Sequence, residues 1–151
     1  MSKFNVLDYK RRLSSFHVEK NISKAVKEGA WQIIDLNKIN LAKGLNSKGR
    51  LVGTYSVVTQ NYARKGRRPN ESKKAGTTYN FNWTGAFING IFITYKNDKI
   101  SFSSTGLGLS KKNFFILSND LLGVEKNRNE LINYDILAPR LRRYFKTHIG
   151  K

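Results

Sequence analysis

Two clusters of basic side chains have the clearest capacity for chemistry in this sequence. In the segment 61–76, four of the five residues from 64 to 68 are Lys or Arg, and the only acid is Glu71. In the C-terminal segment no acid follows Asp135. Lys and Arg bind phosphates and carboxylates through charge-assisted hydrogen bonds. We therefore expect nucleic acid or acidic partners to be contacted by Arg64, Lys65, Arg67, Arg68, Lys73, Lys74, Arg140, Arg142, Arg143 and Lys146.

The chain as a whole is strongly basic. Its 151 residues include 28 Lys and Arg against 10 Asp and Glu, which gives a formal net charge of +18. A compact domain with this surplus repels itself unless an acidic partner neutralises it. Nucleic acid, an anionic membrane surface and acidic proteins are the partner classes that fit. No apolar run approaches the length of a membrane span, so we expect no membrane partner.

Residues for catalysis or metal binding are sparse. Cysteine is absent, which excludes a disulfide framework, a thiolate nucleophile and a Cys-type zinc site. His17 and His148 lie at opposite ends of the sequence, and no carboxylate motif accompanies either one. The carboxylates do not show the clustering of a two-metal nuclease. We predict no metal site, no cofactor and no enzymatic activity; a nuclease with scattered carboxylates is the enzyme alternative.

The clearest element that could position the basic clusters is a helix over 18–42. Val18, Ile22 and Val26 begin a run of small and apolar residues at three- and four-residue spacing. Trp31 falls on the opposite, polar face of this helix. A Trp in that position is either covered by another part of the fold or serves as an interface anchor.

Residues 1–17 read as an N-terminal arm with a short helix. Phe4, Leu7, Leu13 and Phe16 are its apolar residues. The arm either docks on its own domain or reaches a neighbouring subunit. We name Phe4, Leu7 and Trp31 as candidate subunit-interface residues. The N-terminus lacks the apolar core of a secretory signal, so we expect synthesis in a cytoplasm.

The middle of the chain indicates a small, mainly antiparallel sheet. Residues 54–60 and 78–83 have strand character, and 87–95 and 99–103 form a hairpin around Asn97-Asp98. Tyr79, Phe81 and Trp83 alternate along one strand, where they either pack into a core against the helix 18–42 or offer a stacking platform for bases. We favour the core. The basic segment 61–76 between the strands reads as a long exposed loop, either a phosphate- or partner-contacting finger or a merely solvated loop.

The C-terminal third indicates helices. A short helix is predicted over 111–122, and a final one over about 138–148 after a break at Pro139. Its outer face is expected to carry Arg140, Arg142, Arg143 and Lys146. The fold class is therefore α+β, with a long N-terminal helix, a small sheet and C-terminal helices. We expect the arm 1–17 to be followed by a single domain over 18–151.

A set of short motifs resembles a known family. Gly44-Leu45 and Gly49 are followed by Tyr55 and Thr59, a Lys-rich stretch, Thr84-Gly85-x-Phe87, a hairpin and Leu121-Leu122-Gly123. This order resembles small basic proteins encoded by tailed phages and prophages of Bacteroidetes and, more loosely, tail-completion or virion-morphogenesis proteins. The family pattern often has Gln where this chain has Asn40, and a more acidic turn in place of Lys111-Lys112-Asn113.

The resemblance implies a structural virion protein without catalytic residues. Its place would be the neck or tail, as a head-tail connector or tail-completion subunit in a homo-oligomeric ring, made in the host bacterial cytoplasm. Its partners would be portal or other neck and tail proteins, with packaged DNA as a further one. The alternative function is a nucleic-acid-binding domain that uses the loop 64–74 and the C-terminal basic helix.

Overall fold

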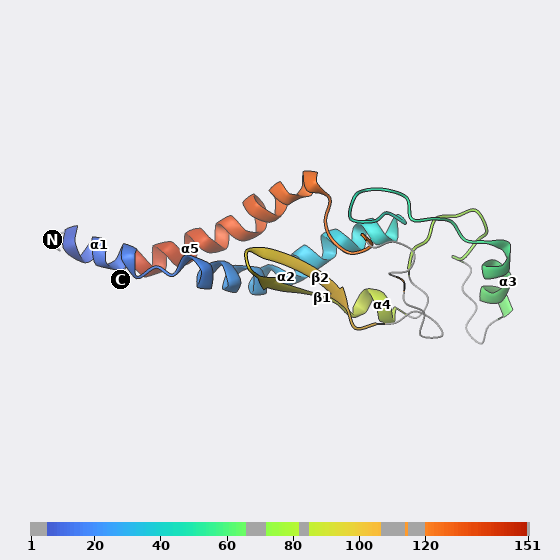
Figure 1. The fold of residues 1–151 in the computed structure, drawn as a ribbon, viewed down its shortest axis with the longest axis horizontal. Helices are drawn as coiled ribbons and strands as arrows, with labels where there is room; N and C mark the ends of the chain where they lie inside the picture. The colour runs from blue at the N-terminus through green and yellow to red at the C-terminus, as the bar shows by residue number, and fades with distance from the viewer. Residues whose placement is uncertain (1–5, 66–71, 82–84, 107–113, 115–119, 151) are drawn as a thin grey trace.

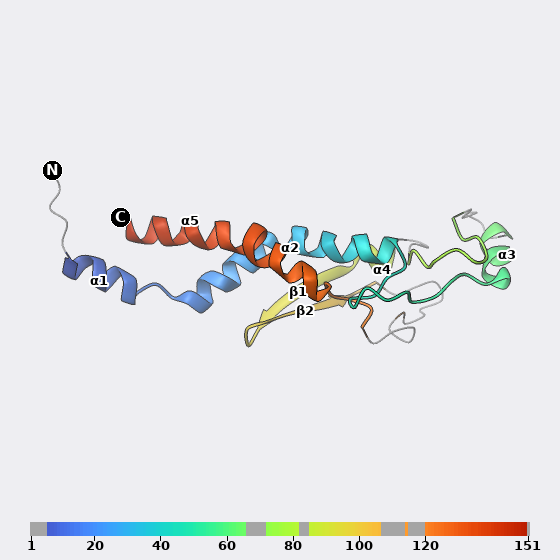
Figure 2. The same cartoon turned by 90° about the horizontal axis from the view of Figure 1, so that it is seen from above.

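The computed structural model describes residues 6–65, 72–81, 85–106, 114 and 120–150. These residues form an elongated molecule, with α1 and the end of α5 at one tip and α3 at the other (Figures 1 and 2). The elements in chain order are α1 (Val6–Ser14), α2 (Val18–Ala42), α3 (Val57–Lys65), α4 (Ala86–Asn89), β1 (Ile91–Lys96), β2 (Lys99–Ser104), the 3-10 helix η3 (Lys126–Arg128), the π-helix η4 (Leu131–Leu137) and α5 (Ala138–Ile149). The predicted α+β class is confirmed.

Helix α2 is the axis of the fold and has the predicted bounds. Its apolar face packs against η4 in a first core that contains Val26, Ile33, Ile132 and Ile136. Gly29 lies at the closest approach of the two helices, since a Cβ atom there would come within 2.5 Å of the Ile136 side chain. A small residue at this position therefore allows η4 to seat on α2.

The hairpin β1–β2 packs beside this core. The strands pair antiparallel from Ile91 opposite Ser104 to Lys96 opposite Lys99. Asn97 and Asp98, at the turn, have φ values of 50° and 56°. Two successive residues with positive φ are what a tight two-residue turn requires, and Asn and Asp adopt this conformation more readily than most residues. The predicted hairpin is confirmed.

A second core lies at the far end of α2. Leu41 at the end of the helix is buried together with Phe81, Phe87, Ile91 and Leu121. The expectation that the aromatic segment packs into a core with α2 is therefore confirmed for Phe81, and Tyr79 is half-buried against the same core. Trp83 lies outside the described residues.

Several predicted elements differ from the observed ones. Residues 57–60 belong to a helix, so the prediction of a strand over 54–60 is wrong. Residues 79–81 form no strand, although Thr78 makes an isolated bridge to Thr54. Within the expected strand 87–95, residues 87–89 belong to α4. Residues 120–122 are not helical, and most of the helix predicted over 111–122 lies outside the described residues.

The final helix is confirmed, but the break before it is not. Pro139 is the second residue of α5, and because helix precedes it, its missing N–H removes one hydrogen bond at the point where the helix type changes. The preceding segment Leu131–Leu137 continues into α5 as a π-helix. The chain therefore changes helix type near Pro139 and stays helical.

Candidate interaction surfaces

Helix α3 occupies one tip of the molecule and carries the first basic residues of the segment 61–76 (Figure 1). That segment was expected to be a loop throughout; residues 61–65 are helical instead. Ser56 explains the start of the helix. Its hydroxyl accepts a hydrogen bond from the Thr59 N–H over 3.2 Å, the N-cap pattern that satisfies a first-turn donor.

The outer side of α3 combines apolar and basic side chains. Val58 and Tyr62, four residues apart and therefore on one face, are 77% and 65% exposed. Arg64 and Lys65 are exposed in the last turn, and the helix contains no acid. Ala63 is buried on the inner side. The tip is thus a basic surface with an exposed apolar stripe. Arg67 and Arg68 lie outside the described residues.

Lys73 does not belong to this surface. The sequence placed it among the contact residues, but its side chain is 2% exposed. Its Nζ donates hydrogen bonds to the Tyr55 hydroxyl at 2.6 Å and to the side-chain Oδ1 of Asn80. The ammonium also lies 4.7 Å from the centre of the Tyr55 ring. Lys73 therefore fastens the segment after 71 to the base of α3, whereas the neighbouring Lys74 is exposed.

Burial changes the acid–base properties of Lys73 and Tyr55. Desolvation lowers the pKa of Lys73 to about 8, since the ammonium loses its hydration. The same effect raises the pKa of Tyr55. The site combines an amine that loses its proton easily with a phenol that keeps it. Sequence reasoning missed this group because Tyr55 lies 18 residues before Lys73, with a helix between them, and because Lys is seldom buried.

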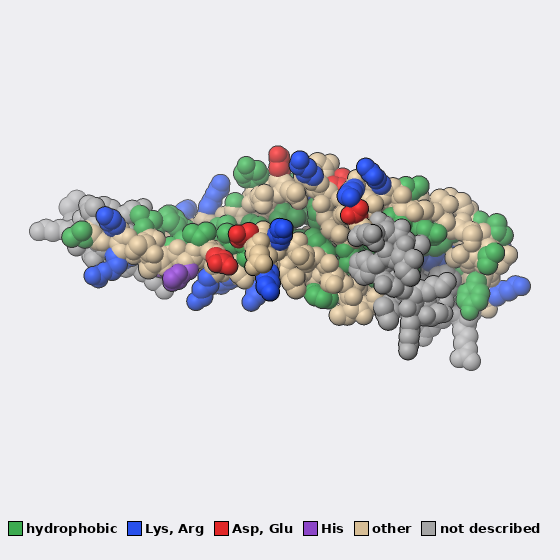
Figure 3. Space-filling view, in the orientation of Figure 1, with side chains coloured by type: hydrophobic (Ala, Val, Ile, Leu, Met, Phe, Trp, Pro, Cys, Tyr) green, Lys and Arg blue, Asp and Glu red, His purple; other side chains and the backbone are tan. Residues whose placement is uncertain are grey.

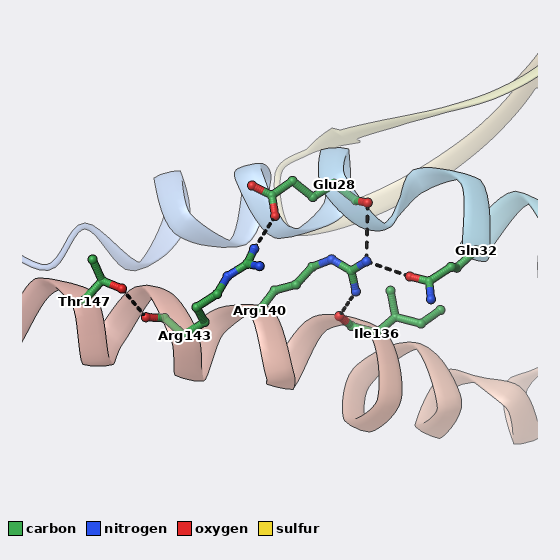
Figure 4. A network of polar contacts seen from close by, with 6 residues as sticks. All are labelled: Glu28, Gln32, Ile136, Arg140, Arg143 and Thr147. Atoms are coloured by element: carbon green, nitrogen blue, oxygen red, sulfur yellow. Dashed lines mark hydrogen bonds and ion pairs between the residues drawn. The ribbon is translucent and has the colours of Figure 1, made fainter.

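The C-terminal basic cluster is divided by its contact with α2 (Figure 4). Arg140, expected on the outer face, instead turns toward α2: its Nη2 donates to Gln32 Oε1 over 2.7 Å and its Nη1 to the Ile136 carbonyl oxygen. Arg143 forms an ion pair with Glu28 at 2.6 Å. Arg142 and Lys146 are exposed and make up the remaining outward charge.

The N-terminal arm docks on its own chain. An Arg12 guanidinium nitrogen donates to the Ile149 carbonyl oxygen over 2.8 Å, and Phe16 packs edge-on against Phe145 with ring centres 5.4 Å apart. His148 Nε2 lies 2.8 Å from the Arg12 carbonyl oxygen, which is a further contact between the arm and α5. Docking still leaves Leu7 exposed. Phe4 lies outside the described residues.

Trp31 is not covered by the described part of the fold. Its side chain is 64% exposed on the polar face of α2, as the helical spacing predicted. The first of the two expectations, burial by another segment, receives no support from the described residues. Trp31 remains a candidate interface anchor.

Neither a metal centre nor a membrane helix is found among residues 6–65, 72–81, 85–106, 114 and 120–150. No three His, Cys, Asp or Glu side chains in these ranges gather as metal ligands would. No helix there combines the length and the apolar character that crossing a bilayer requires. Comparison of the chain with protein-family models, curated proteins and solved structures finds no match.

Proposed function

We propose that this chain is a non-enzymatic structural subunit of a homo-oligomeric ring in the virion of a tailed phage, at the neck or tail. One observation carries the proposal. Large apolar side chains are exposed on helices along the whole length of an elongated molecule, among them Leu7 on α1, Trp31 on α2, Val58 on α3 and Tyr134 on η4.

Exposed apolar side chains at this density point to association. Single surface hydrophobes are ordinary, but aromatic residues and aliphatic stripes are typical of surfaces that a partner covers. Their spread over both tips and the middle favours contacts with more than one neighbour, which is the situation of a subunit in a ring. The virion setting rests on the motif resemblance and on the net charge of +18, which suits packaged DNA or acidic ring partners.

Native mass spectrometry of the purified full chain tests the oligomer. We expect one dominant multimer over a range of protein concentrations, and a shift toward monomer in Trp31→Lys. Lys27→Ala, an exposed position in the same helix, is the matched control and should retain the multimer. Monomers at every concentration and salt would contradict the proposal.

The virion setting has its own test. Phage particles prepared from cells that express the chain are purified by density gradient and digested for peptide mass spectrometry. Peptides of this chain should co-sediment with intact particles at a fixed ratio to the portal protein. Recovery only in the free cytoplasmic fraction would contradict a virion role.

A second candidate function is binding of nucleic acid through the α3 tip. The observation that favours it is the exposed Tyr62 ring three residues before Lys65, on a helix whose last turn also carries Arg64, because aromatic side chains on a basic surface form stacking platforms for bases. Replacing both cations with Ala should make the fall of log K for duplex DNA binding with log salt less steep, by about 0.9 per lost phosphate contact. An unchanged slope would exclude the tip from phosphate contact.

A further inference from the structure

A surface of opposite charge to the α3 tip lies at the start of η4. The α3 tip consists of the exposed residues Val58, Tyr62, Arg64 and Lys65. Glu130, Leu131, Tyr134 and Asp135 are all exposed, and Tyr134 is 69% exposed. The sequence from 129 to 139 contains no Lys or Arg. We call these four residues the η4 patch. It combines apolar side chains with two acids, while the α3 tip combines apolar side chains with two bases.

Acidic and basic side chains are distributed unevenly along the long axis of the molecule. On the face drawn in Figure 3, the described Asp and Glu side chains gather in the middle third, where Lys and Arg side chains lie among them, and only Lys and Arg reach both tips. Between Asp35 and Asp98 the sequence has a single acid, Glu71. The tip that carries α3 is therefore suited to the middle of another copy.

We propose that the α3 tip of one subunit docks on the η4 patch of the next copy of this chain. The inference rests on the proposed ring function and names one contact between its subunits. Val58 and Tyr62 of one copy would cover Leu131 and Tyr134 of the neighbour. Arg64 and Lys65 would approach the neighbouring carboxylates, as complementary charges across an interface do.

Two rival geometries are disfavoured by charge. Tip-to-tip packing would bring α3 to the α1 end of a neighbour, where Lys10 and Arg11 are exposed, and the like charges would repel. A twofold contact of α3 with α3 would oppose Arg64 and Lys65 with their own copies. The contact of the α3 tip with the η4 patch is heterologous, so its repetition generates a ring when the rotation closes.

The two sites lie too far apart for the contact to form within one subunit. In both ribbon views α3 stands at the end of the molecule, and η4, in orange, lies over the middle of α2 (Figures 1 and 2). Helix η4 packs on α2 and is fixed there by the first core. The η4 patch is therefore held in place by its own subunit. Only the α3 tip of a second molecule can reach it.

Cysteine cross-linking of the full chain tests this contact, because the chain contains no Cys of its own. Asn61→Cys in α3 and Asn133→Cys in η4 are exposed positions that leave both apolar stripes intact. The two variants carry affinity tags of different size and are mixed before treatment with a short bismaleimide. We expect the mixed 61–133 dimer as the main product. Ser14→Cys, exposed at the end of α1, reports the tip-to-tip rival.

Charge reversal adds a second readout to the same assay. Arg64→Glu with Lys65→Glu in the first copy should reduce the 61–133 product at least threefold. Glu130→Lys with Asp135→Lys in the second copy should restore it. A 61–61 product, or a 61–14 product, as abundant as 61–133 would overturn the inference, and so would a reversal that the complementary change does not rescue.

Two parallel measurements separate the possible failures. Sedimentation velocity of the unmodified chain reports the oligomer itself: multimers without a 61–133 product overturn this interface and leave the ring proposal standing, whereas monomers at all concentrations overturn the ring. Addition of a duplex DNA of about two helical turns distinguishes the other use of α3. If the chain binds this DNA only when Arg64 and Lys65 are intact, and no 61–133 product forms, the α3 tip binds DNA. That result would overturn the inference.

Discussion

The Lys73 ammonium donates a hydrogen bond to the Tyr55 hydroxyl over 2.6 Å, in a site where Lys73 is almost completely buried. A lysine that the sequence offered as a surface contact thus holds the base of the exposed tip helix. The pair connects the chain before α3 to the chain after it, so the position of the tip depends on this buried contact.

The first prediction concerns the pH dependence of this contact. The pKa of Lys73 is about 8 in the folded chain and near its ordinary value of 10.5 when unfolded. Between these values the unfolded state binds more protons, so the stability contributed by Lys73 rises as pH rises through this window. The raised pKa of Tyr55 opposes the rise above about pH 10.

Urea unfolding at pH 7 and pH 9.5 measures the effect. The free energy of unfolding of the unmodified chain, relative to Lys73→Met, should increase between the two pH values. The exposed Lys74→Met is the control, and its difference from the unmodified chain should stay constant. A constant difference for Lys73→Met as well would contradict the assigned burial.

The second prediction concerns the second core. Phe81 is 4% exposed and packs with Phe87 and Leu41, so Phe81→Ala should cost about 3–5 kcal/mol of stability. Phe92 lies on β1 and is 39% exposed, so Phe92→Ala should cost less than about 1 kcal/mol of stability. Thermal or urea unfolding of both variants gives the comparison, and equal losses would place Phe81 outside the core.

The third prediction separates the arginines of α5. Arg140→Ala removes hydrogen bonds to Gln32 and to the Ile136 carbonyl oxygen, which should cost about 1–3 kcal/mol. Arg142→Ala, at an exposed position of the same helix, should stay within about 0.5 kcal/mol of the unmodified chain. The reverse order of stabilities would mean that Arg140 does not join α5 to α2.

The fourth prediction concerns the contact of α2 with η4. Gly29→Ala would gain about 1 kcal/mol from helix propensity on an isolated helix. Here the new methyl meets the branched side chain of Ile136 at 2.5 Å in a packed core, so we expect a net loss of stability of about 1–3 kcal/mol. Adding Ile136→Leu, which has no branch at Cβ, should recover part of the loss. A stabilised Gly29→Ala variant would contradict the close approach.

Strong periodicity made part of the fold predictable. The bounds of α2 follow from apolar residues at helical spacing over 25 residues, and the turn at Asn97-Asp98 has the residue types that a tight hairpin needs. In both cases the local pattern and the tertiary packing favour the same structure.

Helix α3 was missed because its local signals conflict. Val57, Val58 and Thr59 are β-branched and favour a strand, whereas Ser56 provides an N-cap. Tertiary contacts decided the outcome: Ala63 is buried, and Gln60 Oε1 accepts a hydrogen bond from the Ala75 N–H. Neither contact can be read from spacing.

The candidate surfaces were predicted only in outline for a related reason. Charge counting finds basic residues but does not say which way they turn. Lys73 is buried by partners distant in sequence, and Arg140 is drawn to α2 by Gln32. The η4 patch has only two acids, so charge counting does not single it out. It is recognised from the exposure of Glu130, Tyr134 and Asp135 in the structure.

Electron microscopy of the purified chain tests the central claim most directly. Negative-stain class averages at a concentration where native mass spectrometry finds the multimer should show closed rings of a single rotational symmetry, built from elongated subunits. Arg64→Glu with Lys65→Glu should abolish the rings, and the doubly reversed chain that also carries Glu130→Lys and Asp135→Lys should restore them. Open filaments, or particles the size of single subunits under all conditions, would contradict the account.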